Sequence, residues 1–139
     1  MAQQISEVMT RDPKVLDIHS SLVEAARLMR DNDIGFVVVR DQDTVRGVLT
    51  DRDLVVRGLA EGVDPATTTL ENVYSKEVVH LDPDDSVDEA IELMRTRAIR
   101  RLPVVQDGQV VGVVSLGDLA VQRDPKSVLG EISAAPAND

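Results

Sequence analysis

The sequence contains an internal repeat: when it is shifted by 65 positions, residues 5–54 align with residues 70–119 without a gap. Identical residues are spread along the whole alignment: Val8/Val73, Leu16/Leu81, Ser21/Ser86, Glu24/Glu89, Ala25/Ala90, Met29/Met94, Ile34/Ile99, Gly47/Gly112, Asp53/Asp118 and Leu54/Leu119. Chance does not give a gapless register of this length, so the chain is an internal duplication. Any fold for this chain must accommodate the same structural unit twice.

Each copy carries the same order of secondary-structure signals. An apolar run (residues 15–18 and 78–81) indicates a short strand, and Ser21 and Ser86 open a helix with the Ser-x-x-Glu spacing of a capping box. Two further apolar runs separated by a polar turn (36–39 and 45–49; 102–105 and 109–114) are typical of a hairpin. A second helix is expected from Asp51 and from Leu116, and a short helical lead-in (5–9; 70–74) precedes each copy. The repeated unit is therefore predicted to be β-α-β-β-α.

These units predict an α/β (α+β) fold made of two pseudo-symmetric repeats. One unit of about 50 residues is too small to bury its own sheet, so we expect the two units to pack sheet to sheet. The predicted boundaries are residues 1–62 for the first repeat with its lead-in, 63–69 for a linker, 70–123 for the second repeat and 124–139 for a partly disordered tail.

The composition limits both the core and the partners. With one Phe, one Tyr and no Trp, the core must be built from aliphatic side chains and Met. A formal net charge of -10 argues against nucleic acid or an anionic membrane as the main partner. The chain has no Cys, so disulfides and thiolate metal sites are excluded. The sequence starts without a basic segment followed by an apolar one, so a cytoplasmic protein is expected.

A glycine, a hydroxyl residue and an aspartate recur at fixed spacing in both copies. The stretches are Gly47-Val48-Leu49-Thr50-Asp51-Arg52-Asp53, Gly112-Val113-Val114-Ser115-Leu116-Gly117-Asp118 and Ile99-Arg100-Arg101-Leu102-Pro103-Val104-Val105. Over roughly residues 5–122 the chain resembles a tandem pair of CBS domains, the family named for cystathionine β-synthase. Within that family, Leu49-Thr50-Asp51-Arg52-Asp53 followed by residues 58–65 resembles stand-alone bacterial two-CBS proteins of the hypoxic-response type. The resemblance implies a module that binds adenine nucleotides in clefts between the repeats and forms disc-like dimers.

The corner where the last strand meets the second helix has two interpretations. In the first, Gly47 and Gly112 leave room for a base or sugar, Thr50 and Ser115 offer a helix N-terminus to a phosphate, and Asp53 and Asp118 accept bonds from ribose hydroxyls. In the second, Thr50-x-x-Asp53 and Ser115-x-x-Asp118 are only capping boxes, as at the first helices. The spacing alone does not choose between them.

Further ligand contacts are expected around these corners. By resemblance, Arg100 and Arg101 reach phosphate groups, for which the guanidinium fork is suited, whereas the first repeat has Gly35 and Phe36 at these positions. Arg52 can turn to phosphate or to solvent, and for all three arginines a surface ion pair is the alternative. The first strands are expected to line an adenine pocket, with ordinary core packing as the alternative; the residues are Val15, Leu16, Val79 and Leu81.

Together these signals predict a regulatory module that is not an enzyme. The expected ligand is an adenosine compound (AMP, ADP, ATP or S-adenosylmethionine), with no required cofactor and no metal. The expected protein partners are a second copy, bound through the faces of the second helices, and an unidentified target. The alternative is a ligand-free scaffold for dimerisation or protein docking. No catalytic motif is present, and His19 and His80 each stand alone, so both are expected in exposed loops.

Overall fold

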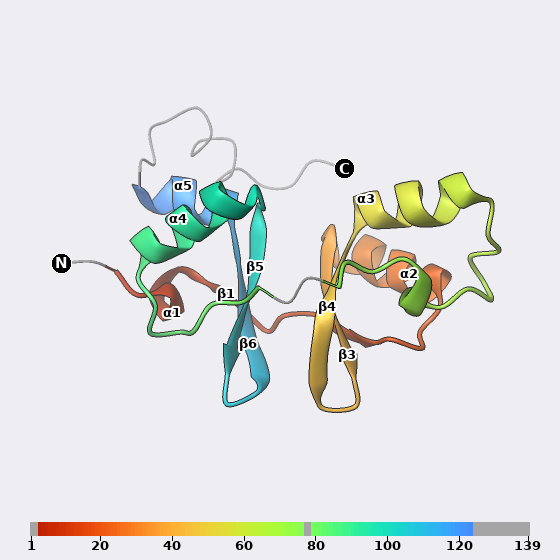
Figure 1. Ribbon diagram of the computed structural model, residues 1–139, viewed down its shortest axis with the longest axis horizontal. Helices are drawn as coiled ribbons and strands as arrows, with labels where there is room; N and C mark the ends of the chain where they lie inside the picture. The colour runs from red at the N-terminus through yellow and green to blue at the C-terminus, as the bar shows by residue number, and fades with distance from the viewer. Residues whose placement is uncertain (1–2, 77–78, 124–139) are drawn as a thin grey trace. The chain divides into compact units, whose positions relative to one another are not determined.

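The computed structural model describes residues 3–76 and 79–123. The predicted tail, residues 124–139, and the start of the predicted strand 78–81 lie outside this part of the chain. The chain divides into two compact units: unit 1 contains Met1–Pro13 and Val79–Asp139, and unit 2 contains Lys14–Val78. Each unit has a three-stranded sheet and covering helices, which confirms the α/β (α+β) class (Figure 1).

Unit 2 contains the body of the first repeat. Its elements are β2 (Val15–Asp17), α2 (Leu22–Asn32), β3 (Phe36–Asp41), β4 (Thr44–Thr50), α3 (Asp51–Asp53), the π-helix η1 (Leu54–Gly58), and the 3-10 helices η2 (Leu59–Glu61) and η3 (Leu70–Asn72). The sheet order is β2-β3-β4, in which β2 is parallel to β3 and β3 is antiparallel to β4. Ser21 caps α2 by accepting a bond from the Glu24 N–H, at 3.1 Å, as its spacing predicts.

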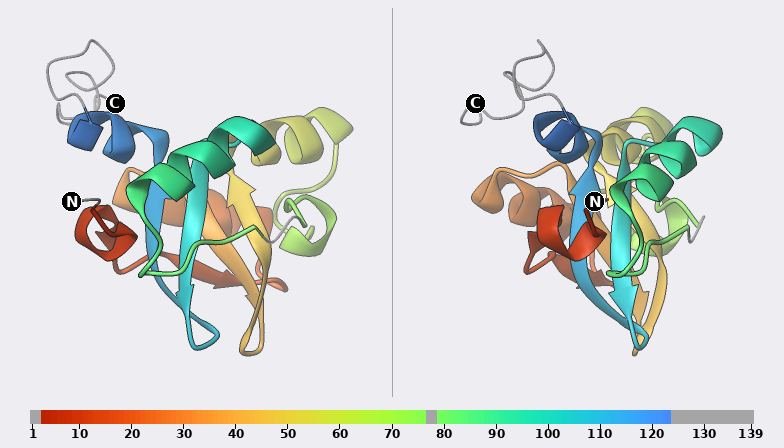
Figure 2. Two further views of the ribbon diagram at one scale, coloured as in Figure 1. Left: turned by 60° about the vertical axis from the view of Figure 1, so that its left-hand side comes forward. Right: turned by 90° about the vertical axis from the view of Figure 1, so that its left-hand side faces the viewer.

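Unit 1 contains the body of the second repeat. Its elements are α1 (Ile5–Val8), β1 (Thr10–Arg11), α4 (Val87–Arg97), β5 (Arg101–Gln106), β6 (Gln109–Ser115) and α5 (Leu116–Arg123). The sheet order is β1-β6-β5 and both pairs are antiparallel; α4 covers one face of the β5–β6 hairpin (Figure 2). The strand predicted at 78–81 is, in its described part, a single parallel bridge from Leu81 to Val104.

The short lead-ins are exchanged between the repeats. Ile5, from the lead-in of the first repeat, is fully buried in the core of unit 1. Leu70, Val73 and Tyr74, from the lead-in of the second repeat, belong to the core of unit 2. The compact units therefore differ from the sequence repeats of residues 1–62 and 70–123, because each lead-in buries its apolar side chains in the unit that contains the other repeat.

The stretch predicted as a linker, residues 63–69, is part of unit 2. The carbonyl oxygens of Pro65 and Thr68 accept bonds at 3.0 Å from the N–H groups of Val23 and Leu22. These N–H groups belong to the first turn of α2, which has no partners within its own helix. The segment thus caps α2 from outside.

The second helix of unit 2 starts at Asp51 as predicted but is less regular than an α-helix. The α-helical part ends at Asp53, and the chain continues as η1 and η2. Gly58, at the end of η1, is buried, and a Cβ added there would lie 2.9 Å from Leu22 Cδ1. The absence of a side chain lets η1 approach α2 closely. In the described part of the chain the longest helices, α2 and α4, have 11 residues, too few and too polar to cross a bilayer.

Candidate functional site

The corner of unit 2 is formed where β4 ends and α3 begins. Thr50 is the N-cap of α3: its Oγ1 accepts a bond from the Asp53 N–H at 3.1 Å, and Asp53 Oδ2 accepts one from the Thr50 N–H at 3.0 Å. These two bonds are a complete capping box. The Thr50-x-x-Asp53 spacing therefore forms the capping box of the second interpretation. A ligand at this corner would have to bind hydrogen-bonding groups that the capping box does not already use.

Asp53 has partners beyond the capping box. The Ser75 hydroxyl donates to Asp53 Oδ2 at 3.3 Å, and Arg57 Nε lies 3.8 Å from Asp53 Oδ1. Arg57 also donates from Nη1 to the carbonyl oxygen of Tyr74, at 3.3 Å. Asp53 is only 8% exposed, which makes it the one buried charged residue in the described part of the chain. Oδ2 thus accepts two hydrogen bonds from the chain itself, and the charge of the carboxylate is paired with Arg57, as a buried charge requires.

The corner of unit 1 repeats the capping box with different neighbours. Ser115 N–H donates to Asp118 Oδ2 and Asp118 N–H donates to Ser115 Oγ, both at 3.0 Å. Asp118 is half-buried, and so more accessible than Asp53. Arg101 lies directly opposite Ser115 in the β5–β6 pair, and the Arg100 carbonyl accepts from the Leu116 N–H at 2.7 Å. The predicted arginine pair therefore borders this corner.

The same positions in unit 2 carry no basic pair. Phe36 lies opposite Thr50 in the β3–β4 pair and is buried, and the Gly35 carbonyl accepts from the Asp51 N–H at 3.0 Å. Arg52, the predicted cation of this corner, is exposed, and its N–H donates to Asp51 Oδ1 at 2.8 Å. Asp51 thus adds a second carboxylate at the start of α3, where unit 1 has the apolar Leu116.

The two glycines have a role that the sequence analysis did not predict. A Cβ on Gly47 would overlap the carbonyl oxygen of Ser75, and a Cβ on Gly112 would lie 2.5 Å from Met9 Sδ and 3.0 Å from the Thr10 carbonyl oxygen. The position of the missing Cβ is therefore filled by Tyr74 and Ser75 in unit 2 and by Met9 and Thr10 in unit 1. Both glycines are needed for close approach of backbone to backbone.

The apolar residues predicted for an adenine pocket lie in different surroundings. Leu81 is 2% exposed in the core of unit 1, and the half-buried Val79 packs against that core. Leu81 therefore has the core role that was its alternative. Val15 and Leu16 lie half-buried on β2, which β3 separates from β4 by two strand spacings, about 10 Å.

Ser75 and Arg57 are site residues that the sequence analysis missed. A signal for Ser75 was present, because the 65-residue shift aligns it with Thr10, a second hydroxyl residue. Arg57 lies four positions after Asp53, the spacing of neighbours on a helix. Of the histidines, His19 Nδ1 lies 3.1 Å from Glu71 Oε1 and His80 is exposed. Among the described residues no group of three or more His, Cys, Asp or Glu side chains could hold a metal ion.

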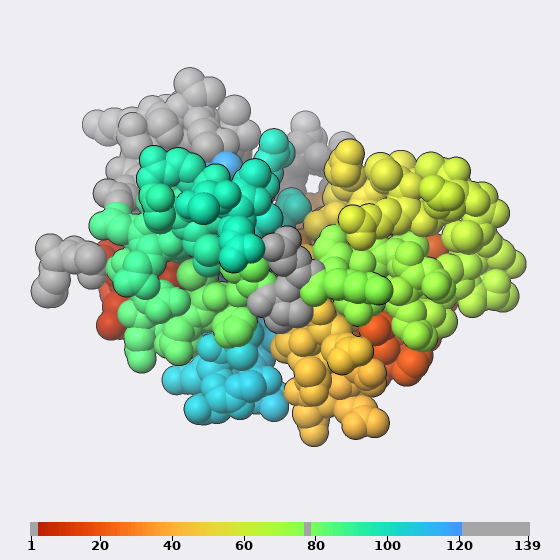
Figure 3. Space-filling model, viewed as in Figure 1, coloured from red at the N-terminus to blue at the C-terminus, as the bar shows by residue number. Residues whose placement is uncertain are grey.

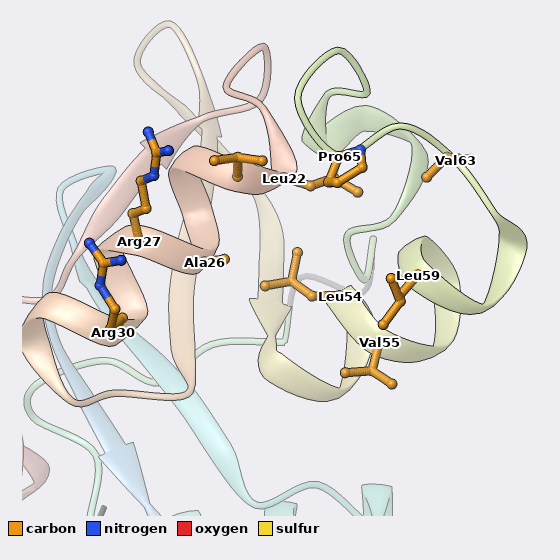
Figure 4. Close-up of a pocket in the computed structure, with 10 residues that line it drawn as sticks. Leu22, Ala26, Arg27, Arg30, Leu54, Val55, Leu59, Val63 and Pro65 are labelled. Carbon is orange, nitrogen blue, oxygen red and sulfur yellow. The ribbon is translucent and has the colours of Figure 1, made fainter.

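Unit 2 also has an apolar groove on its helical side. The groove has a volume of about 370 Å³ between α2, η1, η2 and residues 63–65. In Figure 4, Leu22 and Ala26 of α2 face Leu54 and Leu59, while Arg27 and Arg30 of α2 lie at the end away from Val63. The η1–η2 segment lies at the surface (yellow to lime in Figure 3), and three of its apolar residues are exposed: Val55 by 55%, Val56 by 42% and Leu59 by 69%.

Sequence comparison identifies the two repeats. The family model described as "CBS domain" matches residues 5–58 and 70–122. CBS domain-containing protein YhcV of Bacillus subtilis (strain 168) is 39% identical over 119 residues, 86% of this chain and 84% of YhcV. Hypoxic response protein 1 of Mycobacterium tuberculosis is 38% identical over 103 residues, 73% of this chain and 72% of that protein. The resemblance to the hypoxic-response type is thereby confirmed.

Structure comparison agrees. A crystal structure of Hypoxic Response Protein I with two coordinated zinc ions matches with a TM-score of 0.76 and 32% identity, over 86% of this chain and 98% of the other. The CBS domain pair of protein MJ0100, in complex with 5′-methylthioadenosine and S-adenosyl-L-methionine, matches with a TM-score of 0.81 and 23% identity, over 91% and 100%. At that identity the second likeness shows the fold.

Proposed function

This chain belongs to the CBS-domain family, and from that premise we propose that it is a regulatory module that binds an adenosine ligand and has no catalytic activity of its own. The candidate ligands are AMP, ADP, ATP and S-adenosylmethionine. The matching fold of MJ0100, which binds two adenosine compounds, supports this choice of ligand class. The ligand would bias the packing of the module and so signal to a partner.

The observation that carries the proposal is the pair of matched corners. Each places a carboxylate, Asp53 or Asp118, one turn into a helix beside the hydroxyl of the N-cap. A carboxylate attracts the hydroxyl donors of ribose, whereas phosphate prefers N–H groups and cations. The remaining proposed contacts are Thr50, Arg52, Val15 and Leu16 in unit 2, and Ser115, Arg100, Arg101 and Val79 in unit 1. Three further residues would support the site indirectly. Gly47 and Gly112 allow the backbone to pack closely beside each corner, and Leu81 packs in the core of unit 1.

The charges around the corners favour different ligands. Arg100 and Arg101 border the corner of unit 1, so phosphorylated compounds such as AMP are assigned there. Unit 2 has Gly35 and Phe36 in place of the arginine pair and adds Asp51 at the start of α3, so that corner favours an adenosine compound without phosphate, such as S-adenosylmethionine with its positive sulfonium.

Thermal unfolding tests this function on the full chain with millimolar AMP, ATP and S-adenosylmethionine. A ligand at 100 times its dissociation constant adds about 2.7 kcal/mol of stability, which raises the midpoint by several degrees. The double variant Arg100→Ala/Arg101→Ala should lose the response to AMP and keep that to S-adenosylmethionine. The exposed Arg46→Ala is the matched control. No shift with any compound would reject ligand binding.

The second candidate function is a ligand-free dimerisation module, and the groove of unit 2 favours it. Exposed apolar residues grouped beside a groove mark an interaction surface. The occupant we propose is a second copy of this chain, because the two ends of the surface carry opposite charge. Arg27 and Arg30 lie at one end, and the exposed Glu61 and Asp64 lie near the other. A two-fold axis through the groove would place each end against its complement.

Sedimentation equilibrium tests this surface. Leu59→Glu should convert a dimer to monomer, because it places a charge in the proposed apolar contact. The charge reversal Arg27→Glu/Arg30→Glu should weaken the dimer, and combination with Glu61→Arg/Asp64→Arg should restore it. Arg46→Glu serves as the surface-charge control. A wild-type monomer, or a dimer unaffected by Leu59→Glu, would reject this surface.

A further inference from the structure

Ser75 is attached to the corner of unit 2 through its backbone. Its N–H donates to the Val48 carbonyl at 2.8 Å, and its carbonyl accepts from the Val48 N–H at 3.1 Å. Gly47 makes room for this contact, and Arg57 donates to the neighbouring Tyr74 carbonyl at 3.3 Å. Ser75 precedes the end of unit 2 by three residues, after which the chain enters unit 1. The Tyr74–Ser75 segment is thus bound to the corner just before the chain leaves the unit.

Asp53 links this attachment to the proposed ligand site. Its Oδ2 accepts both the Thr50 N–H, at 3.0 Å, and the Ser75 hydroxyl, at 3.3 Å. The same carboxylate that would accept ribose hydroxyls therefore holds the Tyr74–Ser75 segment. Because Asp53 is 8% exposed, a ligand hydroxyl can reach Oδ2 only by replacing a bond that is already made.

In the part of unit 1 that the structure describes, the corner has no such side-chain link. The 65-residue shift aligns Ser75 with Thr10 and Arg57 with Gln122. Thr10 of β1 pairs with Val113 of β6, so unit 1 has a backbone attachment that corresponds to the one between Ser75 and Val48 in unit 2. Among the described residues, however, Thr10 makes no hydrogen bond to Asp118, and Asp118 is half-buried. Of the two corner aspartates, Asp53 is the one that the described residues show bonded to the side chain of the segment after a lead-in.

We propose that Asp53 couples ligand binding to release of the Tyr74–Ser75 segment. A vicinal diol that donates to Asp53 Oδ2 displaces the Ser75 hydroxyl and loosens the segment through which unit 2 continues into unit 1. Asp118 binds its ligand without such a change. The inference rests on the proposed function for the identity of the ligand, whereas the attachment itself is a property of the free chain. The coupling is reciprocal. Removing the Ser75 hydroxyl should therefore strengthen diol binding by the same factor by which the ligand shifts the equilibrium toward the released segment.

Amide hydrogen exchange measured by NMR on the full chain tests this coupling. Ser75→Ala should accelerate exchange of the Val48 and Ser75-position amides about fivefold, the effect of one net hydrogen bond. Ser75→Thr should restore slow exchange. The matched control is Thr10→Ala, which should leave exchange of the β6 amides within twofold. In the wild type, millimolar adenosine should accelerate the Val48 and Ser75 amides, and 2′,3′-dideoxyadenosine, which has no diol, should not.

The outcomes separate this inference from the proposed function. If adenosine raises the thermal midpoint but leaves these two amides unchanged, the coupling is overturned and the ligand function stands. If no adenosine compound changes the midpoint, the proposed function fails and the coupling to adenosine fails with it. In that case the exchange rates measured without ligand still test the attachment of the Tyr74–Ser75 segment. If Ser75→Ala and Thr10→Ala accelerate amide exchange equally, the attachment through Asp53 is overturned.

Discussion

The two strand–helix corners have the same capping box and different neighbours. In both, a hydroxyl N-cap and an aspartate exchange hydrogen bonds of 3.0–3.1 Å. In unit 2 the aspartate is buried and also binds Ser75 and Arg57, whereas in unit 1 it is half-buried, and Arg101 lies opposite the N-cap Ser115. The shared capping box starts a helix in both copies, so the repeated motif has a structural role at both corners. What distinguishes the corners functionally is the set of residues around the motif.

The largest difference between the units is expected at the glycines. Gly47→Ala should cost about 3 kcal/mol of unfolding free energy, because its Cβ would overlap the Ser75 carbonyl oxygen in the backbone. Gly112→Ala should cost about 1 kcal/mol, because the two nearest atoms belong to the flexible Met9 side chain and the nearest backbone atom, the Thr10 carbonyl oxygen, is 3.0 Å away. Urea unfolding of both variants measures the two costs. Equal costs would contradict the asymmetry of the two backbone contacts.

A smaller difference is expected at the aspartates. Asp53→Ala should cost about 2–3 kcal/mol, because it leaves the Thr50 N–H and the Ser75 hydroxyl without their acceptor and removes the ion pair with Arg57. Asp118→Ala should cost about 1 kcal/mol, the usual effect of losing a capping interaction. Guanidinium unfolding of both variants gives the comparison. A greater cost at Asp118 would show that the extra contacts of Asp53 do not stabilise unit 2.

No difference is expected at the first helices, which makes them an internal standard. Ser21 and Ser86 each cap a helix of 11 residues with one bond of 3.1 Å to the backbone three residues on. Ser21→Ala and Ser86→Ala should therefore each cost about 1 kcal/mol. Thermal unfolding of the two variants should give midpoints within about one degree of each other. Unequal midpoints would mean that the repeats differ even where their local contacts match.

Local features of this fold could be predicted from the sequence, and contacts between distant segments could not. The serine caps, the hairpins and the capping boxes depend on residues a few positions apart, so the periodicity and spacing of the sequence predict them. The exchanged lead-ins depend on which core Ile5 and Leu70 enter, which no local pattern specifies. The role of Gly47 and the bond from Ser75 to Asp53 follow from that exchange. The close approach of η1 to α2 at Gly58 and Leu22 likewise joins segments that are far apart in the sequence.

The predicted ligand residues show the same limit. Arg101 lies beside the corner because strand pairing sets it opposite Ser115, which the hairpin pattern implied. Leu81 is in the core, because the apolar character that suggested an adenine pocket equally suits burial. Sequence spacing could name both corners as candidates, but the difference between them arises from Ser75, Arg57 and the extent of burial.

In the free chain Asp118 is available to a ligand and Asp53 is engaged by Ser75 and Arg57, and calorimetric titration with AMP tests this difference most directly. The titration compares the wild type with Asp118→Asn and Asp53→Asn, which remove the charge and keep the shape of each side chain. The account predicts that Asp118→Asn weakens AMP binding at least tenfold, the effect of losing a charged hydrogen bond, and that Asp53→Asn changes it less than threefold. Greater loss in Asp53→Asn, or equal loss in both variants, would contradict the claim.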